Sequence, residues 1–224
     1  MNRPHEVPII SAVAFDLDGL MVNTEELYTE VGGVLLGRRG KQVTRELLDN
    51  MMGRQSSAAL QVMIDWHHLD DTVEQLQQET DEIFSGLIEK RLAPMPGLLP
   101  LLDKIEERDI PKSVTTSSRR FFVDRVLELV GISDRFHFLL TAEDIVHGKP
   151  APEIYQKAAQ RFQIDPGALL VLEDSEIGCR AAMTAGAYTV AVPGIHSQRH
   201  NFSGVHLVAK SLADPDIERI LHLL

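Results

Sequence analysis

Two aspartates near the start of the chain, Asp16 and Asp18, have the type and spacing of residues that do chemistry together. They follow an apolar run and precede Gly19, a pattern that predicts a buried strand ending in a turn. Residues two apart on an extended chain point the same way, so both carboxylates can address one small volume. One can attack while the other moves a proton. Taken alone, the pair is also compatible with an ordinary acidic loop or helix N-cap, which is the more common arrangement.

Polar residues also follow later apolar runs. The hydroxyls and amides of residues 115–118 could hold an anion, or serve only as a hydroxyl-rich N-cap. Lys149, between Gly148 and Pro150, presents a cation on a tight turn, and a solvated loop lysine is the alternative. Glu173 and Asp174 follow an apolar strand, where a helix cap is the alternative.

The elements that must position these residues alternate from Pro94 onward. Helices are predicted from Pro96-Gly97 through Ile105 and over 121–130, 152–162 and 176–185, with strands over 112–116, 136–140, 168–172 and 188–192. This alternation is typical of βαβ units and predicts a parallel sheet that includes the first strand.

The carboxyl edge of such a sheet gathers the polar residues into one pocket. Its members are Asp16, Asp18, Thr116, Lys149, Glu173 and Asp174. Two carboxylates ~4 Å apart repel by about 4 kcal/mol at an effective dielectric of 20, so the cluster requires a cation. The ligands on offer are oxygens, which suit Mg²⁺ rather than zinc. A carboxylate nucleophile, Mg²⁺, a lysine and hydroxyl donors together describe phosphoryl transfer.

A long helical stretch separates the first strand from the rest of the sheet. From about residue 24 to 91 apolar residues recur at three-to-four-residue spacing, with no strand candidate among them. We therefore predict a helical domain over 22–92, inserted into a core made of 1–21 and 93–224. Gly32 and Gly33 would each cost a helix about 1 kcal/mol against alanine, which predicts an irregularity there.

Composition limits the partners. The chain has 224 residues, 44% of them hydrophobic, and a formal net charge of −11 with no concentration of Lys and Arg, so nucleic acid and anionic membranes are not expected partners. No run reaches the ~20 apolar residues of a membrane span, and the first ten residues lack a signal-peptide pattern. We expect a cytoplasmic protein, monomeric or weakly dimeric, with its single cysteine, Cys179, in the core.

The motifs resemble those of the haloacid dehalogenase superfamily of aspartate-nucleophile phosphatases and mutases. The resemblance covers nearly the whole chain and is carried by Asp16-Leu17-Asp18-Gly19, Thr116-Ser117, and residues 147–155 and 172–178. It implies an α/β fold, with a Rossmann-like parallel sheet core and an inserted α-helical cap domain. Within the superfamily the chain is similar to the capped group that contains β-phosphoglucomutase, phosphoglycolate phosphatase and pseudouridine-5′-phosphatase. Asn23 stands where the family usually has an aspartate, and is interpreted as a helix N-cap.

The resemblance implies roles for the acidic residues. Asp16 would attack phosphorus and carry an aspartyl-phosphate, while Asp18 would protonate the leaving oxygen and then activate water. Mg²⁺ would be held by the side chains of Asp16 and Asp174 and by the backbone carbonyl of Asp18. Glu173 would orient that shell or join it.

Substrate-binding roles follow in the same way. Thr116, Ser117 and Lys149 would bind the phosphate oxygens. Arg54, in a segment that resembles the part of the cap facing the active site, could bind a hydroxyl or a second anion on the leaving group, although a solvated arginine is as compatible with its position.

The resulting functional hypothesis is a Mg²⁺-dependent phosphatase of a small phosphorylated metabolite, either a sugar phosphate or a nucleoside or pseudouridine 5′-phosphate. Asp18 argues against carbon–halogen chemistry, because haloacid dehalogenases lack an aspartate there. A phosphosugar mutase is the alternative, although Tyr28 replaces the histidine that β-phosphoglucomutases carry. A noncatalytic phosphate-binding or regulatory protein on the same fold is a further alternative.

Overall fold

A parallel sheet forms the centre of the molecule. The computed structural model describes residues 8–223, and its six strands lie in the order β3-β2-β1-β4-β5-β6. The strands are β1 (Ala12–Phe15), β2 (Lys112–Thr115), β3 (Phe138–Leu140), β4 (Leu169–Glu173), β5 (Tyr188–Ala191) and β6 (Leu207–Val208). The chain runs from β1 outward to β2 and β3, then crosses to β4 on the other side of β1. The predicted α/β fold with a Rossmann-like parallel sheet is confirmed.

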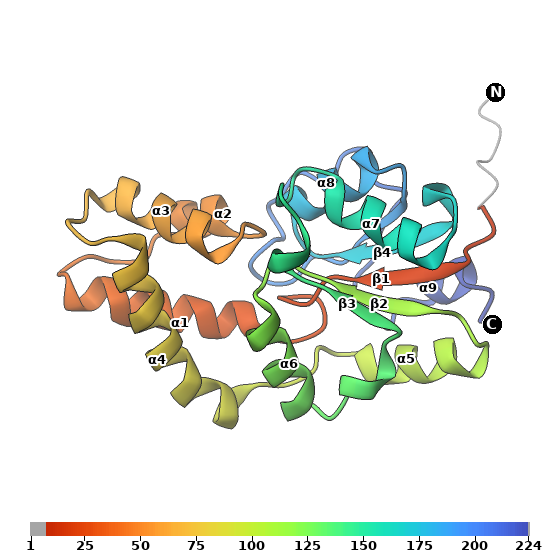
Figure 1. Cartoon of the computed structure of the whole chain (residues 1–224), viewed down its shortest axis with the longest axis horizontal. Coiled ribbons are helices and arrows are strands. Elements are labelled where there is room, and N and C mark those ends of the chain that lie inside the picture. The colour runs from red at the N-terminus through yellow and green to blue at the C-terminus, as the bar shows by residue number, and fades with distance from the viewer. Residues whose placement is uncertain (1–7, 224) are drawn as a thin grey trace.

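Helices cover both faces of the sheet (Figure 1). One face carries α5 (Leu98–Glu107), α6 (Arg120–Leu129) and α9 (Pro215–Ile220), and the other carries α7 (Glu153–Phe162) and α8 (Glu176–Thr184). Successive side chains of a strand point to opposite faces, so every residue of β1 is buried. Val13 and Phe15 pack with the first group of helices, while Ala12 and Ala14 pack with the second.

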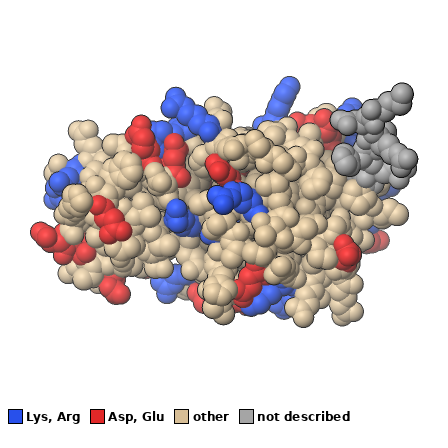
Figure 2. Space-filling view, turned by 90° about the horizontal axis from the view of Figure 1, so that it is seen from above, with Lys and Arg blue, Asp and Glu red and all other residues tan. Residues whose placement is uncertain are grey.

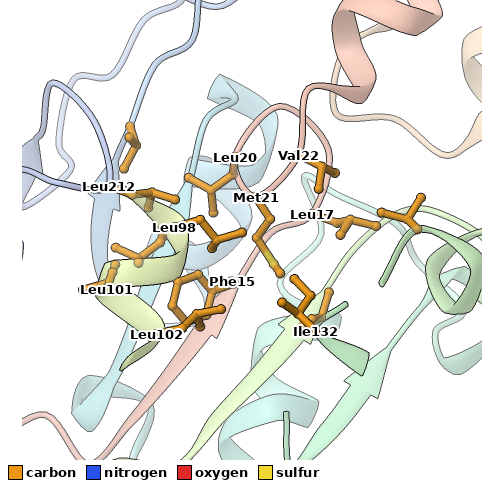
Figure 3. Close-up of a cluster of buried hydrophobic side chains, with 14 of the residues drawn as sticks. Phe15, Leu17, Leu20, Met21, Val22, Leu98, Leu101, Leu102, Ile132 and Leu212 are labelled. Carbon is orange, nitrogen blue, oxygen red and sulfur yellow. The ribbon is translucent and has the colours of Figure 1, made fainter. Parts of the chain in front are cut away.

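The larger core lies under α5. Figure 3 shows Phe15 of β1 beside Leu101 and Leu102, with Met21 and Leu17 from the turn after β1 close by. These side chains are at most 2% exposed. Burial of the turn itself fixes the segment that carries Asp16 and Asp18 relative to the sheet.

The first four helices after β1, residues 24–91, form a helical segment that lies to one side of the sheet (Figure 1). They are α1 (Thr24–Arg38), α2 (Arg45–Met51), α3 (Ser56–His67) and α4 (Val73–Arg91). Leu36, Leu47, Leu60, Met63 and Leu76 form an apolar cluster of their own among these helices. The predicted helical stretch is therefore present, while its definition as a separate domain over 22–92 stays a prediction.

The irregularity predicted at Gly32-Gly33 is wrong, because α1 continues through both residues. Gly32 is buried and its missing side chain faces Val43 and Met63, whereas Gly33 faces open space. The packing of α1 against α4 outweighs a glycine penalty of about 1 kcal/mol per residue.

Asn23 occupies the N-cap position of α1, as predicted, but its side chain makes no capping hydrogen bond to the helix. Its Nδ2 donates to the carbonyl of Arg91 (3.1 Å) and its Oδ1 accepts from the amide of Ala93 (2.8 Å). Val22 and Pro94 form an antiparallel bridge beside these contacts. The segments that leave and rejoin the sheet are thus tied together by an amide, which can donate and accept at once.

Several elements extend beyond the predicted ones. The sequence pattern did not predict the short strand β6 or the helix α9. It also did not predict three single-turn 3₁₀ helices, which are η1 (Ser133–Arg135), η2 (Ala142–Asp144) and η3 (Pro166–Ala168). A two-residue strand shows too few alternations for a periodicity argument. Cys179 is buried, as predicted.

Surface charges of both signs are interspersed on the face shown in Figure 2. Among the described residues, no helix is both long and apolar enough to cross a membrane. The expected cytoplasmic location and oligomeric state stay predictions.

Candidate active site

The predicted site residues come together at the carboxyl edge of the sheet. Asp16 follows β1, Thr116 follows β2, and Glu173 ends β4, with β1 paired between the other two strands. The order of the chain reverses at β1, and such a switch point is where open α/β sheets bind ligands. The strand order therefore determines where the site lies, because the turn after β1 is flanked by the carboxyl ends of β2 and β4.

Lys149 lies between two of the clustered carboxylates. Its side chain is 1% exposed, and Nζ lies 2.5 Å from Asp16 Oδ1 and 2.6 Å from Glu173 Oε1. Nζ also donates to the carbonyl of Thr115 at 3.2 Å. All three N–H bonds of the ammonium group are thus engaged. The two carboxylates keep the pKa of Lys149 well above its usual value in spite of burial, which acts to lower it.

Glu173 is completely buried and accepts hydrogen bonds at both oxygens. Oε1 accepts from Lys149 and from the Tyr155 hydroxyl (2.8 Å), and Oε2 accepts from the Ser175 amide (3.2 Å) and hydroxyl (3.0 Å). Four donors leave this carboxylate little capacity for a further ligand. Of the two roles that the resemblance implies, orientation of the site fits this geometry better than direct metal binding.

The buried carboxyl groups of Asp16 and Asp174 have raised pKa values, and Asp174, unlike Glu173, has an oxygen without a hydrogen-bond partner among the described residues. Burial raises the pKa of Asp16 to about 8, with Lys149 opposing the rise and Glu173 adding to it. Burial raises the pKa of Asp174 well above its usual value, with nearby carboxylates, Glu25 first among them, adding to the rise. Oδ2 of Asp174 is buried and has no hydrogen-bond partner among the described residues. An unpaired buried carboxylate oxygen is costly, so the site calls for a cation.

The donor set fits Mg²⁺. Asp16, Glu173 and Asp174 each offer a carboxylate oxygen, and these oxygens lie within 4.8 Å of one another. Carboxylate oxygens are the ligands that hard divalent cations prefer. Because Glu173 is saturated by protein donors, Asp16 and Asp174 are the side chains free to bind an ion. The role of the Asp18 backbone carbonyl stays a prediction.

Three hydroxyl groups hold the Asp18 carboxylate. Oδ1 accepts from Thr24 (2.7 Å), and Oδ2 accepts from Ser118 (2.6 Å) and Thr116 (3.3 Å). Thr116 was predicted as a phosphate ligand, and in this structure its hydroxyl faces Asp18. Thr24 and Ser118 were not predicted as site residues. Ser118 stands in the hydroxyl-rich run 115–118, so a signal for it was present, whereas the role of Thr24 depends on the turn between β1 and α1.

Glu25 and Tyr155 were also missed. Burial raises the pKa of Glu25 well above its usual value, and the nearby carboxylates of Asp18, Asp16 and Glu173 add to the rise. A Cβ at Gly19 would lie 2.5 Å from Asp174 Oδ2 and 2.9 Å from the carboxyl carbon of Glu25, so this glycine lets the two acids approach. No spacing rule connects residues 19, 25 and 174.

The helical segment reaches the site through the loop between α2 and α3. The Ser117 hydroxyl donates to the carbonyl of Gly53 at 3.2 Å, and a Cβ at Gly53 would lie 2.9 Å from Ser175 Oγ. Arg54 is exposed at the cavity rim, and its Nε donates to the carbonyl of Asn50 at 2.7 Å. The loop thus lines the cavity next to Ser117, while the binding roles of Ser117 and Arg54 stay predictions.

A cavity of about 160 Å³ lies between the carboxyl edge of the sheet and the helical segment. Asp16, Asp18 and Asp174 line one part of it, together with the hydroxyl residues Thr116, Ser117, Ser118 and Ser175. Residues of α1 to α4 and of the loops that join α1, α2 and α3 line much of the remainder. The carboxylates of Asp16, Asp18 and Asp174 thus open onto a space that can hold a small molecule.

Fold and site together define a Rossmann-like α/β hydrolase with an acidic centre at the carboxyl edge of its sheet. The family model described as haloacid dehalogenase-like hydrolase matches residues 13–192, and the chain belongs to this family. The predicted superfamily membership is confirmed.

Relatives and solved structures agree with this family. A Drosophila melanogaster protein named "Probable pseudouridine-5'-phosphatase" is 30% identical over 92% of this chain and 91% of its own length. A "Phosphorylated carbohydrates phosphatase" of Thermotoga maritima is 26% identical over 96% of this chain and 98% of its own. The crystal structure of CbbY from Rhodobacter sphaeroides in complex with phosphate has a TM-score of 0.81 at 24% identity, covering 92% of this chain and 96% of that one, and this likeness shows the fold.

Proposed function

We propose that this chain is a Mg²⁺-dependent phosphatase that hydrolyses a small phosphorylated metabolite through an aspartyl-phosphate on Asp16. The broader class, a phosphoric monoester hydrolase, is confirmed by the family and by the phosphatase relatives. The observation that carries the proposal is the buried Asp16 carboxylate, which lines the cavity with its Oδ1 2.5 Å from Lys149 Nζ. Candidate substrates are a sugar phosphate and a nucleoside or pseudouridine 5′-phosphate.

The reaction begins at Asp16. A carboxylate oxygen of Asp16 attacks phosphorus, and the bond between phosphorus and the leaving oxygen breaks as the new bond forms. Asp18 gives its proton to the leaving oxygen. Asp18 then takes a proton from a water molecule that attacks the aspartyl-phosphate, which releases inorganic phosphate and restores Asp16.

The hydroxyl groups around Asp18 support both of its protonation states. A hydroxyl donates to an ionised carboxylate, and after rotation it accepts from a protonated one. Thr24, Thr116 and Ser118 can therefore keep the Asp18 carboxyl group in place while its proton leaves and returns.

Asp16 and Asp174 would hold Mg²⁺, with Glu173 keeping Lys149 in place beside them. When bound, the ion supplies positive charge that favours the ionised form of Asp16 and offsets charge on the transferring phosphoryl group. Lys149 adds a second positive charge at the attacking carboxylate.

We further propose that residues 22–92 act as a cap over a core formed by 1–21 and 93–224. The contact of Gly53 with Ser117 supports this division, because it lets the helical segment close one side of the cavity. A closed cavity excludes water from the first step of the reaction.

Phosphate release from a panel of sugar phosphates and nucleoside 5′-phosphates, with and without Mg²⁺, tests the proposal in wild type and Asp16→Asn. We expect Mg²⁺-dependent release that falls by at least about 10³-fold in Asp16→Asn. Conversion of β-glucose 1-phosphate to the 6-phosphate without phosphate release would indicate a mutase instead. Tight phosphate binding without any turnover would indicate a noncatalytic protein.

A further inference from the structure

The cavity beside the catalytic carboxylates continues into the helical segment, and there its lining changes from acidic to apolar. The apolar part is formed by side chains from α1, α2 and α3 and from the loop between the first two helices. They include Leu35, Val43, Leu47, Met51, Leu60 and Met63. Such a lining gains free energy from contact with apolar surface and loses it when a hydroxyl is buried without a partner.

One hydroxyl in this lining has no partner. Thr80, on α4, lines the cavity and is 6% exposed, and its Oγ1 makes no hydrogen bond in the described structure. Two other lining hydroxyls are engaged, since Thr29 donates to the carbonyl of Glu25 and Ser56 donates to Gln77 Oε1. Buried polar groups are normally paired, so the Thr80 hydroxyl indicates a ligand atom that faces it.

Gly32 keeps the apolar part open. A Cβ at this position would lie 3.5 Å from Val43 and 3.8 Å from Met63, so a larger side chain would fill the space between them. Glycine is unfavourable inside a helix, yet α1 carries it on the side that faces the cavity. Gly33, the next residue, has nothing within 4 Å of a Cβ and lies outside the cavity lining.

The size of the cavity limits what can enter. Its volume is about 160 Å³, and an apolar protein cavity of roughly 150 Å³ holds one benzene ring. The volume of this cavity includes the part beside the carboxylates, so the apolar part is smaller than the whole cavity. A single six-membered ring is therefore the largest ring system that the apolar part can hold, and fused rings exceed it. A sugar of the same size would bury several hydroxyls against leucine, valine and methionine side chains, with Thr80 to pair only one of them.

We propose that this part of the cavity binds a single six-membered heteroaromatic ring of the leaving group, with one polar ring atom facing Thr80. The substrate is then a phosphate monoester of an alcohol that carries such a ring, and Thr80 and Gly32 determine this specificity. The inference rests on the proposed phosphatase function and chooses among its substrate classes.

The test compares three monophosphates that share the ribose 5-phosphate group: ribose 5-phosphate, uridine 5′-phosphate and adenosine 5′-phosphate. In wild type, kcat/KM for the uridine compound is expected to exceed those of the other two by at least about tenfold, which is the size of one good interaction. Thr80→Val is expected to reduce the ratio between uridine and ribose compounds by about tenfold. Gly32→Leu is expected to abolish the ratio, whereas the matched control Gly33→Leu retains it.

An equilibrium measurement separates this inference from the catalytic proposal. Uridine, which has no phosphate, is expected to bind Gly33→Leu measurably and Gly32→Leu at least about tenfold more weakly by isothermal titration calorimetry. Circular dichroism melting checks that both variants fold. Asp16-dependent phosphate release with equal kcat/KM for the ribose and uridine compounds would overturn the inference and leave the phosphatase proposal standing. Absence of phosphate release from every ester would overturn the phosphatase proposal, and unaltered uridine binding in Gly32→Leu would overturn the ring site by itself.

Discussion

The Cα of Gly178, in the first turn of α8, lies against the carboxylate of Glu173, so that any side chain at position 178 would overlap Oε1. Because that oxygen also accepts from Lys149 and Tyr155, the glycine leaves room for the buried network behind Asp16.

We therefore expect Gly178→Ala to lower the free energy of unfolding by about 2 kcal/mol and to reduce phosphate release sharply, since overpacking must move Glu173 away from Lys149. Urea unfolding and steady-state assays measure the two effects. Gly33→Ala is the control, because it adds a methyl group in open space and removes a helix penalty of up to about 1 kcal/mol. Wild-type stability in Gly178→Ala would show that Glu173 lies elsewhere.

Lys149→Met tests whether the ammonium group between Asp16 and Glu173 is needed for activity. The substitution keeps a side chain of similar length but leaves Asp16 and Glu173 without their shared donor. We expect phosphate release to fall by at least about 10²-fold. Lys157→Met, on the neighbouring helix α7 and half-exposed, is the matched control and should retain activity. Near-normal turnover in Lys149→Met would exclude a role for this ammonium group in catalysis.

Metal dependence should be concentrated in Asp174, whose Oδ2 lacks a protein partner. Chelation with EDTA is expected to remove activity, and added Mg²⁺ to restore it. Asp174→Asn should need at least about tenfold more Mg²⁺ for half-maximal activity, because the loss of one charged ligand weakens a hard-cation site. Asp134→Asn, at the opposite edge of the sheet, serves as control. An unchanged Mg²⁺ requirement in Asp174→Asn would contradict the assignment.

Asn23 should stabilise the contact between the segment that leaves the sheet before α1 and the segment that returns to it after α4. Asn23→Asp keeps the acceptor for the Ala93 amide but loses the donor to the Arg91 carbonyl. We expect a loss of about 1 kcal/mol in the free energy of unfolding. Asn50→Asp, whose amide donates to an exposed carbonyl within α2, should cost less. Urea titration compares the free energies of unfolding of the two variants. Equal losses would contradict the inference that Asn23 links the two segments.

Stability at acid pH should depend on Glu106. The hydrogen bond that Glu106 accepts from Arg135 is the main reason why its pKa falls from the usual 4.5 to about 2. A hydrogen bond from buried Lys112 lowers this pKa further. A lowered folded-state pKa means that the contribution is complete above about pH 4.5 and is lost as the pH falls through about 2.

Glu106→Gln is thus expected to lower the free energy of unfolding by about 1 kcal/mol at pH 7, a modest figure because Glu106 is partly exposed to water. The difference from wild type should shrink as the pH approaches 2. Glu107→Gln, at the exposed neighbouring position, is the control. A pH-independent difference would mean that the carboxylate charge does not contribute.

Much of the fold was predictable because its signals are local. Apolar runs after Pro94 marked the strands, and the rule that parallel strands end at one edge placed Asp16, Lys149 and Asp174 together. The same rule could not say which donor meets which acceptor. Glu173 was grouped with possible metal ligands, yet its partners Tyr155 and Ser175 depend on how α7 and α8 pack on the sheet.

The remaining misses have a common physical cause. The hydroxyl of Thr24 reaches Asp18 only because the chain turns sharply between β1 and α1. Gly32 was interpreted through helix propensity alone, although its neighbours Val43 and Met63 come from other elements. Propensity is a weak guide where tertiary packing decides.

The antiparallel bridge between Val22 and Pro94 has a consequence for the history of such a chain. Since the two ends of the helical segment meet there, the whole segment can be exchanged for one of different length without stretching the sheet. In the division that we propose, natural variation or laboratory recombination can then replace the helices that line the cavity, while the residues at the carboxyl edge of the sheet stay the same.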